Sequence, residues 1–518
     1  MTRKKPSVLA HATAASLFVL LAPAVACATP AQPHPTQPVQ RPSAPPPTPP
    51  PSPIPTSPAP SPEKLRSLAQ RVEAALTVAG LRGARIGVAI AEIESGRVLY
   101  ARGADEALNP ASNSKLVTTL ASLALLGPEY HWKTALFGGS PEAGVIQGDL
   151  VLKGYGDPTL QPADLWRLAA MLASQGVRRV TGAVVVDDSF FDDQRLPPGF
   201  EQKDEDLPFR AATSAASVAY NAVGVTVWPT ADGQPPRVVV DPPSSYVRVV
   251  VKARSSKRPG GTLVVHSEGV GDTTVVTVSG RITLRSEPRA FYRRIEHPSL
   301  YAGAVLRELL IRRGIAVDKP DIRRGTVNAA SQRTLAHLES EPLSVIIRTV
   351  NKRSNNMMSE QILKTLGAET GGLPGTFPKG QAAIGRFLKG IALPGTWEYK
   401  NGSGLYDANR FSASQLVHVL RYAYRDFRVS SDFVASLAVA GADGTVSHRL
   451  SGHPSERWVR AKTGTLAGIS TLSGYAGAPG RGPLAFAILL NGVSEGNEPA
   501  ARKAQDDIAD ALVGYLQD

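Results

Sequence analysis

Two residues near the start of an apolar segment have the types and spacing needed for nucleophilic chemistry. Ser112 and Lys115 lie three residues apart in Ser112-Asn113-Ser114-Lys115, so on a helix they share one face. A serine hydroxyl is a poor nucleophile until a base removes its proton. Lys115 can be that base only if burial or a second cation lowers its pKa. The pair therefore predicts an activated serine at the beginning of a helix.

Two further motifs follow along the 518-residue chain. Ser354-Asn355-Asn356 lies between two predicted helices, and Lys462-Thr463-Gly464-Thr465 lies at the end of a predicted strand. Each pattern alone is weak evidence, because residues 61–64 repeat the first one beside a proline-rich segment that cannot form a buried site. All three together predict a catalytic cluster assembled from distant parts of the chain.

Each motif also has a purely structural interpretation. Ser112 could cap its helix, the turn at residues 354–356 could cap the next helix, and Lys462 could protect an edge strand. The segment 112–126 is apolar on all sides, which is typical of a buried helix. A solvated position for Lys115 is therefore disfavoured.

The surrounding elements are predicted from hydrophobic spacing. Strand-like runs at 85–93 and 97–102 are joined by a hairpin turn at Ser95-Gly96. Helices are expected near 63–78, 343–350, 357–366, 379–388, 414–424 and 499–516, and strands near 458–462, 469–475 and 484–490. Between these parts, residues 131–341 hold short β-rich runs with fewer helices, near 165–172 and 300–313. Asp187-Asp188 follows one such run; it could contact a substrate, although a solvated loop is the simpler interpretation.

The first residues are predicted to direct export. A basic segment, Arg3–Lys5, precedes an apolar stretch over 9–26, as in secretory signals, and Pro23 and the modest apolar length argue against a membrane-spanning anchor. The single cysteine, Cys27, resembles a bacterial lipoprotein acceptor, although Ala24 stands where that pattern prefers Leu. The other interpretation is an ordinary cleavage site nearby, and both remain open. Sixteen of the 33 residues from 30 to 62 are proline, which predicts an extended polyproline stalk.

Composition excludes several other classes of protein. One cysteine excludes a disulfide framework, an iron–sulfur cluster and a thiolate zinc site, and none of the nine histidines forms a metal-binding motif. Glycine-rich phosphate loops are also missing, so no nucleotide cofactor is expected. Together these observations predict an enzyme without a metal or a cofactor. A formal charge of +13 suits anionic partners such as an acidic wall polymer or a membrane face. Nucleic acid is disfavoured, because no basic run with interleaved aromatic residues occurs.

The three motifs resemble the active-site triplet of the serine penicillin-recognising enzymes. The likeness is greatest to the D-alanyl-D-alanine carboxypeptidase/endopeptidase family, peptidase family S13 (low-molecular-mass class C penicillin-binding proteins). It covers residues 63–518 and includes the segments 110–112, 154–160, 351–356 and 401–405. There are two departures: Asn401 stands where the family usually has Asp, and Asn355 stands where Asp is common elsewhere. Neither removes a group that the chemistry needs.

Motif spacing separates this family from its relatives. From Ser112 to Ser354 is 242 residues, whereas 108 residues separate Ser354 from Lys462. A compact β-lactamase has no room for the first interval, and a class C-like lactamase or esterase would show Tyr in place of Ser354. A large insertion between the first and second motifs is a feature of the S13 peptidases.

The resemblance implies an α+β fold, a serine β-lactamase/transpeptidase-like domain with an antiparallel sheet flanked by helices and a large inserted β-rich region. We expect a signal peptide at 1–28 and a Pro-rich linker at 29–62. The transpeptidase-like domain comprises 63–130 and 342–518, and the inserted domain or domains comprise 131–341.

The resemblance also implies a role for each motif residue. Ser112 is the nucleophile, Lys115 the base, and Ser354 relays a proton to the leaving amine. Asn356 bonds both Lys115 and the substrate backbone. The substrate carboxylate would be held by Lys462, Thr463, Gly464 and Thr465, and the oxyanion hole by the backbone N–H groups of Ser112 and Thr465.

We expect an exported enzyme of the periplasm or cell envelope that needs no cofactor. It would hydrolyse D-Ala-D-Ala or D,D-cross-links in peptidoglycan stem peptides through an acyl-serine, and β-lactams would be covalent inhibitors. Membrane attachment is expected only through an acylated Cys27. The alternatives are a non-catalytic, tethered wall-binding or β-lactam-sensing module and a serine β-lactamase. The sequence leaves open the balance between carboxypeptidase and endopeptidase activity.

Overall fold

The computed structural model describes residues 59–518, which belong to one compact unit. The predicted signal peptide, Cys27 and most of the predicted proline-rich linker lie outside the described residues. Within residues 59–518, no helix is both long and apolar enough to span a bilayer.

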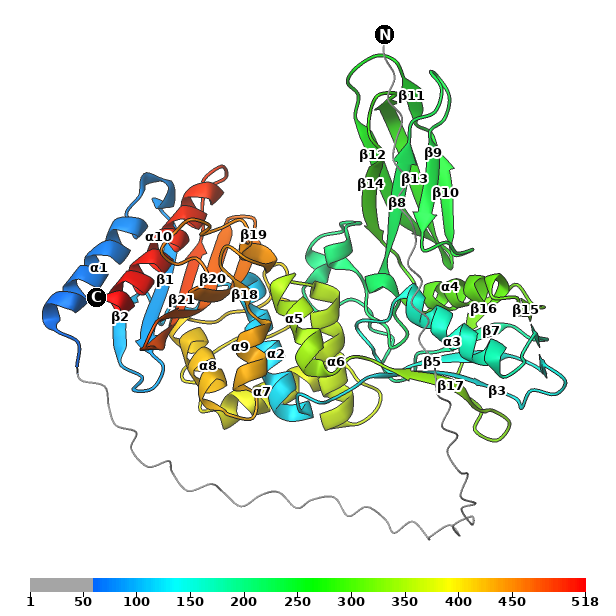
Figure 1. The fold of residues 1–518 in the computed structure, drawn as a ribbon, viewed down its shortest axis with the longest axis horizontal. Coiled ribbons are helices and arrows are strands. Elements are labelled where there is room, and N and C mark those ends of the chain that lie inside the picture. The colour runs from blue at the N-terminus through cyan, green and yellow to red at the C-terminus, as the bar shows by residue number, and fades with distance from the viewer. Residues whose placement is uncertain (1–58) are drawn as a thin grey trace, which may run out of the picture. The chain divides into compact units, whose positions relative to one another are not determined.

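A six-stranded antiparallel sheet joins the beginning and the end of the described chain (Figure 1). Its order is β18-β19-β20-β21-β1-β2, and β1 pairs with β21 from Arg85↔Asn491 to Glu92↔Leu484. The strands are β1 (Arg85–Glu92), β2 (Val98–Arg102), β18 (Ala438–Val439), β19 (Val459–Leu466), β20 (Ile469–Ala478) and β21 (Arg481–Asn491). The predicted antiparallel sheet is therefore confirmed, including the hairpin at residues 85–102.

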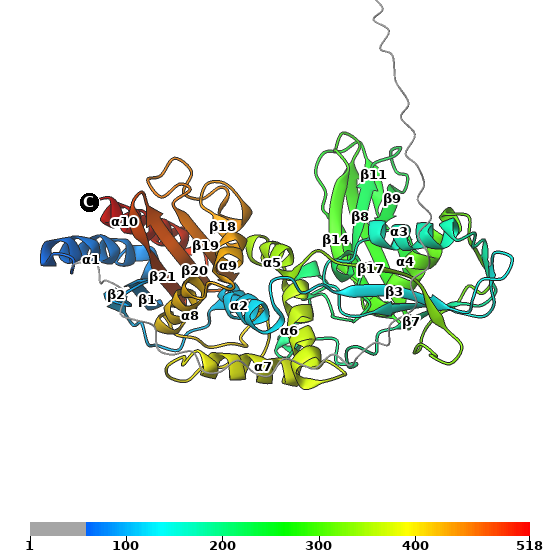
Figure 2. The same cartoon turned by 60° about the horizontal axis from the view of Figure 1, so that its bottom comes forward.

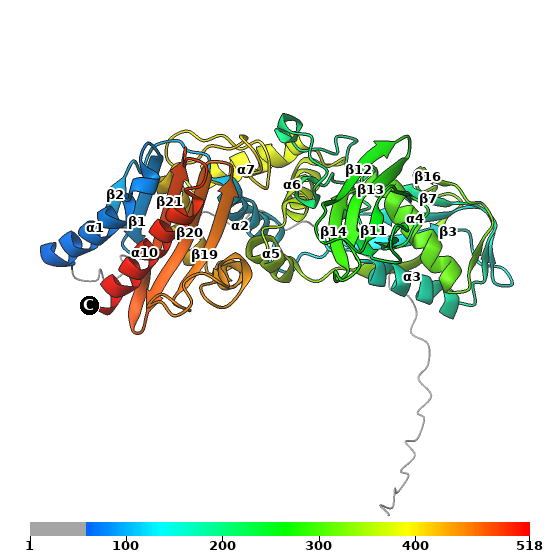
Figure 3. The same cartoon turned by 90° about the horizontal axis from the view of Figure 1, so that it is seen from above.

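Side chains along β21 point alternately to the two faces of this sheet, and both faces are buried. Phe486 and Ile488 pack against α1 (Pro62–Leu76) and α10 (Glu498–Gln517). Ala487 and Leu489 point to the opposite face, which α8 (Ala413–Arg425) covers (Figure 2). Figure 3 shows α1 and α10 on the first face. The sheet thus lies between two helical layers, as the fold class predicts.

The second helical layer supplies two of the three motifs. α2 (Ser114–Leu126) packs against α5 (Leu343–Lys352) and α6 (Asn356–Gly371), and every residue from Ser114 to Leu123 is buried (Figure 2). α7 (Phe377–Gly390) and the short α9 (Ser430–Ser436), which was not predicted, complete the layer. The prediction of a buried helix after Ser112 is confirmed.

The region between the first two motifs contains both predicted helices, near 165–172 and 300–313, and parallel strand pairs that the sequence did not predict. A five-stranded sheet has the order β16-β7-β5-β3-β17, and β5/β7 and β7/β16 are parallel pairs. Because parallel strands need a crossover, α3 (Pro162–Ser174) connects β5 to β7, and α4 (Pro298–Arg312) packs beside α3. The strands are β3 (Lys133–Gly138), β5 (Leu150–Gly154), β7 (Val184–Asp187), β16 (Ile322–Arg324) and β17 (Arg333–Glu339), and the short β4 (Val145–Ile146), β6 (Arg179–Val180) and β15 (Ala316–Val317) form a further small sheet.

Two smaller sheets complete this region and extend away from α4 (Figure 1). One contains β14 (Arg289–Arg294), β8 (Ala222–Trp228) and β9 (Arg237–Asp241). The other contains β10 (Val247–Val251), β11 (Arg254–Ser256), β12 (Leu263–Val270) and β13 (Thr273–Thr283). Both share one hydrophobic core with the five-stranded sheet. The boundaries 131 and 341 for separate domains stay a prediction.

Candidate active site

A strained turn presents Ser112 at the start of α2. Ser112 lies in the 3₁₀ turn Ala111–Asn113, where the buried Ala111 has a φ of 46°. The N–H of Ala111 donates to Asn109 Oδ1 at 2.8 Å, and Asn113 Nδ2 donates to Ser473 Oγ on β20 at 2.7 Å. A non-glycine residue at positive φ persists only where its surroundings fix it. The sheet and these two side chains do so here.

Lys115 is fully buried and contacts three oxygen atoms. Its Nζ lies 3.0 Å from Ser112 Oγ, 2.7 Å from Asn356 Oδ1 and 2.7 Å from the carbonyl oxygen of Ser403. The orientation of the Asn356 amide is consistent with this, because its Nδ2 donates to the carbonyl oxygen of Phe209 at 2.8 Å. One lysine therefore connects the first motif, the second motif and the 401–404 loop.

The surroundings of Lys115 favour its neutral form. Burial lowers its pKa well below the ordinary value of 10.5, and the charge of Lys462 lowers it further, while the buried Glu360 opposes the shift. A neutral lysine has two N–H donors and one lone pair. The Ser403 carbonyl and Asn356 Oδ1 can only accept, so they use both donors. The lone pair is then left for the proton of Ser112 Oγ.

The second cation lies on β19 and contacts the second motif. Lys462 Nζ donates to Ser354 Oγ at 2.9 Å and to the carbonyl oxygen of Thr463 at 2.7 Å. Burial lowers the pKa of Lys462 to about 7. Ser354 has a φ of 56°, and Asn355 caps α6 by accepting from Met358 N at 3.0 Å. The capping interpretation of this turn is thus correct for Asn355, while Ser354 and Asn356 face the two lysines.

Two glycines allow the backbone to pass close to the nucleophile. A Cβ on Gly464 would lie 2.2 Å from Thr471 Oγ1 and 3.0 Å from the carbonyl oxygen of Pro110. Gly404 has a φ of 73°, and a Cβ there would lie 1.9 Å from the carbonyl oxygen of Ala111. Only glycine fits at these contacts, which bring β19 and the 401–404 loop against the Ser112 turn.

Sequence reasoning missed a buried carboxylate that shapes this loop. Glu360 on α6 accepts from Gly402 N at 2.9 Å and from Ser403 N at 2.7 Å. Burial raises its pKa, and its hydrogen bonds and Lys115 act in the opposite direction. Its position four residues after Asn356 places both on one helix face, and an acidic residue within an otherwise buried helix was the available signal.

Asn401 lies in the loop that contacts Lys115. Neither Asn401 nor Gly402 has a positive φ; the left-handed residues of this loop are Gly404 and Tyr406. Asn401 is buried, accepts from Gly404 N at 2.8 Å and donates to the carbonyl oxygen of Pro198 at 3.0 Å. It stabilises the loop that contacts Lys115.

The remaining residues of the third motif lie at the edge of the cluster. Thr463 Oγ1 donates to Thr445 Oγ1 at 2.7 Å, and Thr465 is exposed. Both line a cavity of about 300 Å³ together with Arg449 and Arg502. Arg449 is paired with Asp506 at 2.7 Å, so Arg502 is the side chain of this cavity that could attract an anion beside the third motif.

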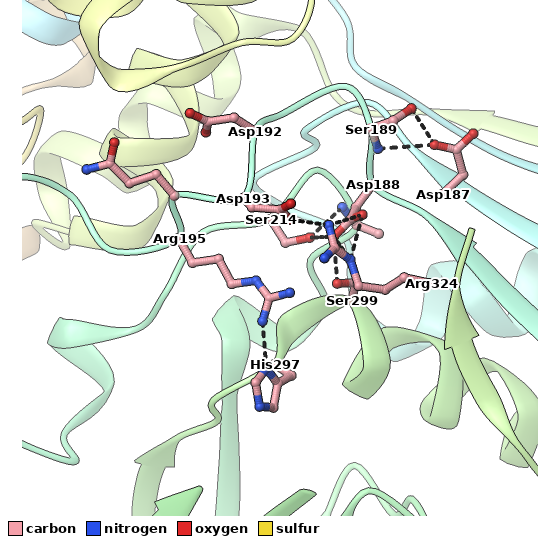
Figure 4. Close-up of polar contacts among 12 residues, drawn as sticks. Asp187, Asp188, Ser189, Asp192, Asp193, Arg195, Ser214, His297, Ser299 and Arg324 are labelled. Carbon is pink, nitrogen blue, oxygen red and sulfur yellow. Dashed lines mark hydrogen bonds and ion pairs between the residues drawn. The ribbon is translucent and has the colours of Figure 1, made fainter. Parts of the chain in front are cut away.

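Asp187 and Asp188 are not among the contacts of Lys115 or Lys462, and their burial shows that the solvated-loop interpretation is wrong. Figure 4 shows their polar contacts. Asp187 accepts from Lys153 Nζ at 2.8 Å. Asp188 accepts from Arg324 at 2.9 Å and from Ser299 Oγ at 2.7 Å. Both aspartates are buried, because these partners satisfy them. They stabilise the inserted region rather than forming a solvated loop. No group of three or more His, Cys, Asp or Glu residues in the described part of the chain could hold a metal ion.

The sheet, the buried helix behind the serine–lysine pair and the two further motifs define a protein of the serine β-lactamase/transpeptidase class. Within that class, the chain belongs to the D-Ala-D-Ala carboxypeptidase 3 (S13) family, whose profile matches residues 68–512. This match confirms the resemblance inferred from the motifs.

Individual relatives agree with this assignment. A D-alanyl-D-alanine carboxypeptidase of an Actinomadura species is 35% identical over 468 residues, which cover 87% of this chain and 85% of the relative. The D-alanyl-D-alanine carboxypeptidase DacB of Haemophilus influenzae is 25% identical over 427 residues, 80% of this chain and 87% of the relative. The crystal structure of penicillin binding protein 4 (dacB) from H. influenzae has the same fold, with a TM-score of 0.73 at 23% identity over 85% of this chain and 99% of that one.

Proposed function

We propose that this protein is a serine-type D-Ala-D-Ala carboxypeptidase/endopeptidase that hydrolyses peptidoglycan stem peptides through an acyl-serine and is inhibited covalently by β-lactams. The observation that carries the proposal is the set of three contacts of the buried Lys115 with Ser112, Asn356 and Ser403. The names of the Actinomadura and Haemophilus relatives support the substrate.

Acylation begins with proton transfer from Ser112 to the neutral Lys115. Ser112 Oγ attacks the carbonyl carbon of the penultimate D-Ala, and the carbonyl oxygen becomes an oxyanion. The backbone N–H groups of Ser112 and Thr465 would stabilise that charge, by about 3–4 kcal/mol for each donor. The partial positive charge at the start of α2 acts in the same direction.

Collapse of the intermediate breaks the C–N bond and needs a proton on the leaving amine. The Ser354 hydroxyl donates this proton and recovers one from Lys115, so that Lys115 is neutral again. Lys462 donates to Ser354 Oγ and stabilises the charge that develops there. Water then attacks the acyl-serine while Lys115 takes its proton. The bond between Ser112 Oγ and the carbonyl carbon breaks, and Lys115 returns the proton to Ser112 Oγ.

The other motif residues bind the substrate. Lys462 and the hydroxyls of Thr463 and Thr465 would hold the terminal carboxylate beside the cations of the neighbouring cavity. The Asn356 amide, which bonds Lys115, would also bond the substrate backbone. Gly464 lets β19 approach close enough for these contacts.

Release of D-Ala from a purified pentapeptide stem tests the proposal. The wild-type chain should release one D-Ala per peptide, and Ser112→Ala should release none while keeping its melting temperature. A wild-type chain that binds penicillin but releases no D-Ala would instead support the β-lactam-sensing alternative.

We also propose that the chain is exported to the periplasm or cell envelope, with Cys27 as the site of any lipid anchor. The basic and apolar segments at the N-terminus and the proline-rich residues after them support this proposal. Mass spectrometry of the mature N-terminus tests it. Lipid on Cys27 would establish the anchor, a free N-terminus near residues 27–29 would establish release, and an intact Met1 in the mature protein would contradict export.

A further inference from the structure

A second cavity lies next to the catalytic cluster, between the inserted region and the turn of the second motif. Its volume is about 530 Å³. The turns at residues 208–210 and 219–221 and strands β8, β9 and β14 contribute residues from the inserted side, and residues 353–357 contribute from the other. Ser354 and Asn356 therefore belong both to this cavity and to the cluster around Lys115.

Aromatic rings are exposed to this cavity. Phe209, Tyr220 and Tyr292 all line it, and they are 39%, 36% and 62% exposed. Large apolar side chains usually avoid water, and a concave site where several of them meet a few polar groups is typical of ligand binding. The three rings give the cavity a surface on which an extended peptide could pack.

The backbone that carries Tyr220 is strained. Ala219, Tyr220 and Asn221 have φ values of 51°, 56° and 53°, three consecutive non-glycine residues in the left-handed region. Asn221 stabilises this turn, because its buried Nδ2 donates to the carbonyl oxygen of Ala212 at 2.7 Å and to Ser217 Oγ at 2.8 Å. Strain of this kind is concentrated at functional sites. Here it fixes the Tyr220 ring at the cavity.

Charged groups give the cavity a polar side. Arg353, which directly precedes Ser354, is exposed and lines the cavity, and Asp241 lines it as well. Burial raises the pKa of Tyr220, and the charge of Arg353, which lines the same cavity, opposes that rise. A ligand with both apolar side chains and a carboxylate would match this combination of rings and cation.

We propose that this cavity binds the second peptide stem of a D,D-cross-linked substrate, the part of the molecule that leaves when the cross-link is cut. The inference rests on the proposed function, because Ser354 there donates the proton to the leaving amine. In a simple stem, the leaving group is a single D-Ala. In a cross-link, the chain continues beyond that amine as a second peptide, and the cavity begins at Ser354. The carboxylate of that stem pairs with Arg353, and its side chains pack on Tyr220 and Tyr292.

If this cavity binds the second stem, its variants should affect two substrates of the same reaction differently. Losing a ring or the cation should weaken binding of the cross-linked leaving group and leave a single D-Ala unaffected. Asparagine tolerates the left-handed conformation, so Tyr220→Asn removes the ring and keeps the turn. Arg353→Gln removes the charge, and Tyr292→Ser, on strand β14, gives a third variant with unstrained backbone. Phe427→Ser is the matched control, since Phe427 is 97% exposed and does not line the cavity.

The experiment compares kcat/KM of the full chain on an uncross-linked pentapeptide and on a purified D,D-cross-linked muropeptide dimer. Tyr220→Asn and Arg353→Gln should each lower the value for the dimer by about tenfold, the scale of one lost aromatic or charge-assisted contact. The value for the pentapeptide and the rate of penicillin acylation should stay within about twofold of wild type, and Phe427→Ser should change neither.

The possible failures are distinguishable. Equal losses on both substrates, no loss on the dimer in any of the three variants, or a wild-type chain that cuts the pentapeptide but not the dimer would overturn the subsite. A wild-type chain that is acylated by penicillin and cuts neither substrate would overturn the proposed function itself.

Discussion

Replacing Gly464 by alanine tests how closely the third motif must approach the nucleophile. The added Cβ would lie 2.2 Å from Thr471 Oγ1, and 3.0 Å from both Ala111 Cβ and the Pro110 carbonyl oxygen. Thr471 is buried and its hydroxyl donates to that same carbonyl at 3.0 Å, so it cannot turn away without losing a hydrogen bond. The substitution must therefore push β19 away from the turn that carries Ser112.

The structure sets the size of the effect. An ordinary contact of about 3.4 Å requires a movement of about 1 Å at the threonine hydroxyl, and less at the Pro110–Ala111 backbone. A misplacement of about 1 Å costs about 100-fold in rate, or about 2.7 kcal/mol of transition-state stabilisation. We expect Gly464→Ala to slow penicillin acylation of Ser112 by that factor. Adding Thr471→Ala removes the closest contact but leaves the two at 3.0 Å, so the double variant should recover about tenfold.

Stopped-flow acylation with a chromogenic β-lactam measures these rates, and thermal melting checks the fold. Gly482→Ala is the matched control, because a Cβ at that position on β21 would meet no atom within 4 Å. If Gly464→Ala were acylated at the wild-type rate, the steric argument would be refuted. A double variant whose effects simply add would show that Thr471 is not the obstacle.

Three further predictions concern charge. Lys115→Arg should abolish acylation as completely as Lys115→Ala, because arginine keeps its proton at accessible pH; wild-type acylation by the arginine variant would make Lys115 a structural cation. Acylation needs a neutral Lys115, whose pKa is lowered, and a charged Lys462, whose pKa is about 7. The rate of acylation should therefore rise with pH at low pH and fall above a pH of about 7. In Lys462→Arg, the residual acylation rate should no longer fall there, because arginine stays charged. Asp188→Asn should lower the free energy of unfolding by about 1–3 kcal/mol, since it removes the charge of a carboxylate only 10% exposed from its ion pair with Arg324, which is 36% exposed. Asp193 pairs with the same arginine but is 75% exposed, so Asp193→Asn should lower the free energy of unfolding by less. Denaturant titrations measure both values.

Local signals in the sequence were sufficient for much of the catalytic half. The apolar run after Ser112 predicted the buried helix α2, and alternating residues around Ser95-Gly96 predicted strands that the structure places at Arg85–Glu92 and Val98–Arg102. The sequence also predicted that the three motifs meet. Lys115 indeed lies within hydrogen-bond distance of Asn356, 241 residues away. The catalytic roles of these residues stay predictions.

Features that depend on distant contacts could not be predicted. The role of Glu360 depends on two backbone N–H groups more than 40 residues away, and that of Asp188 depends on Arg324, 136 residues away. Asp188 has an ordinary local sequence, and the buried helix around Glu360 indicated its burial but not its partners. The parallel pairing of β5 with β7 and the left-handed turn at 219–221 have the same origin, because tertiary contacts outweigh local preference there.

Intact-mass measurement after incubation with penicillin tests the central claim most directly, followed by peptide mapping of the adduct. The account predicts one covalent adduct per chain, on Ser112, the nucleophile that Lys115 activates. Ser112→Ala should show no adduct at an unchanged melting temperature. An adduct on a different serine, or an alanine variant that is still acylated, would contradict the account.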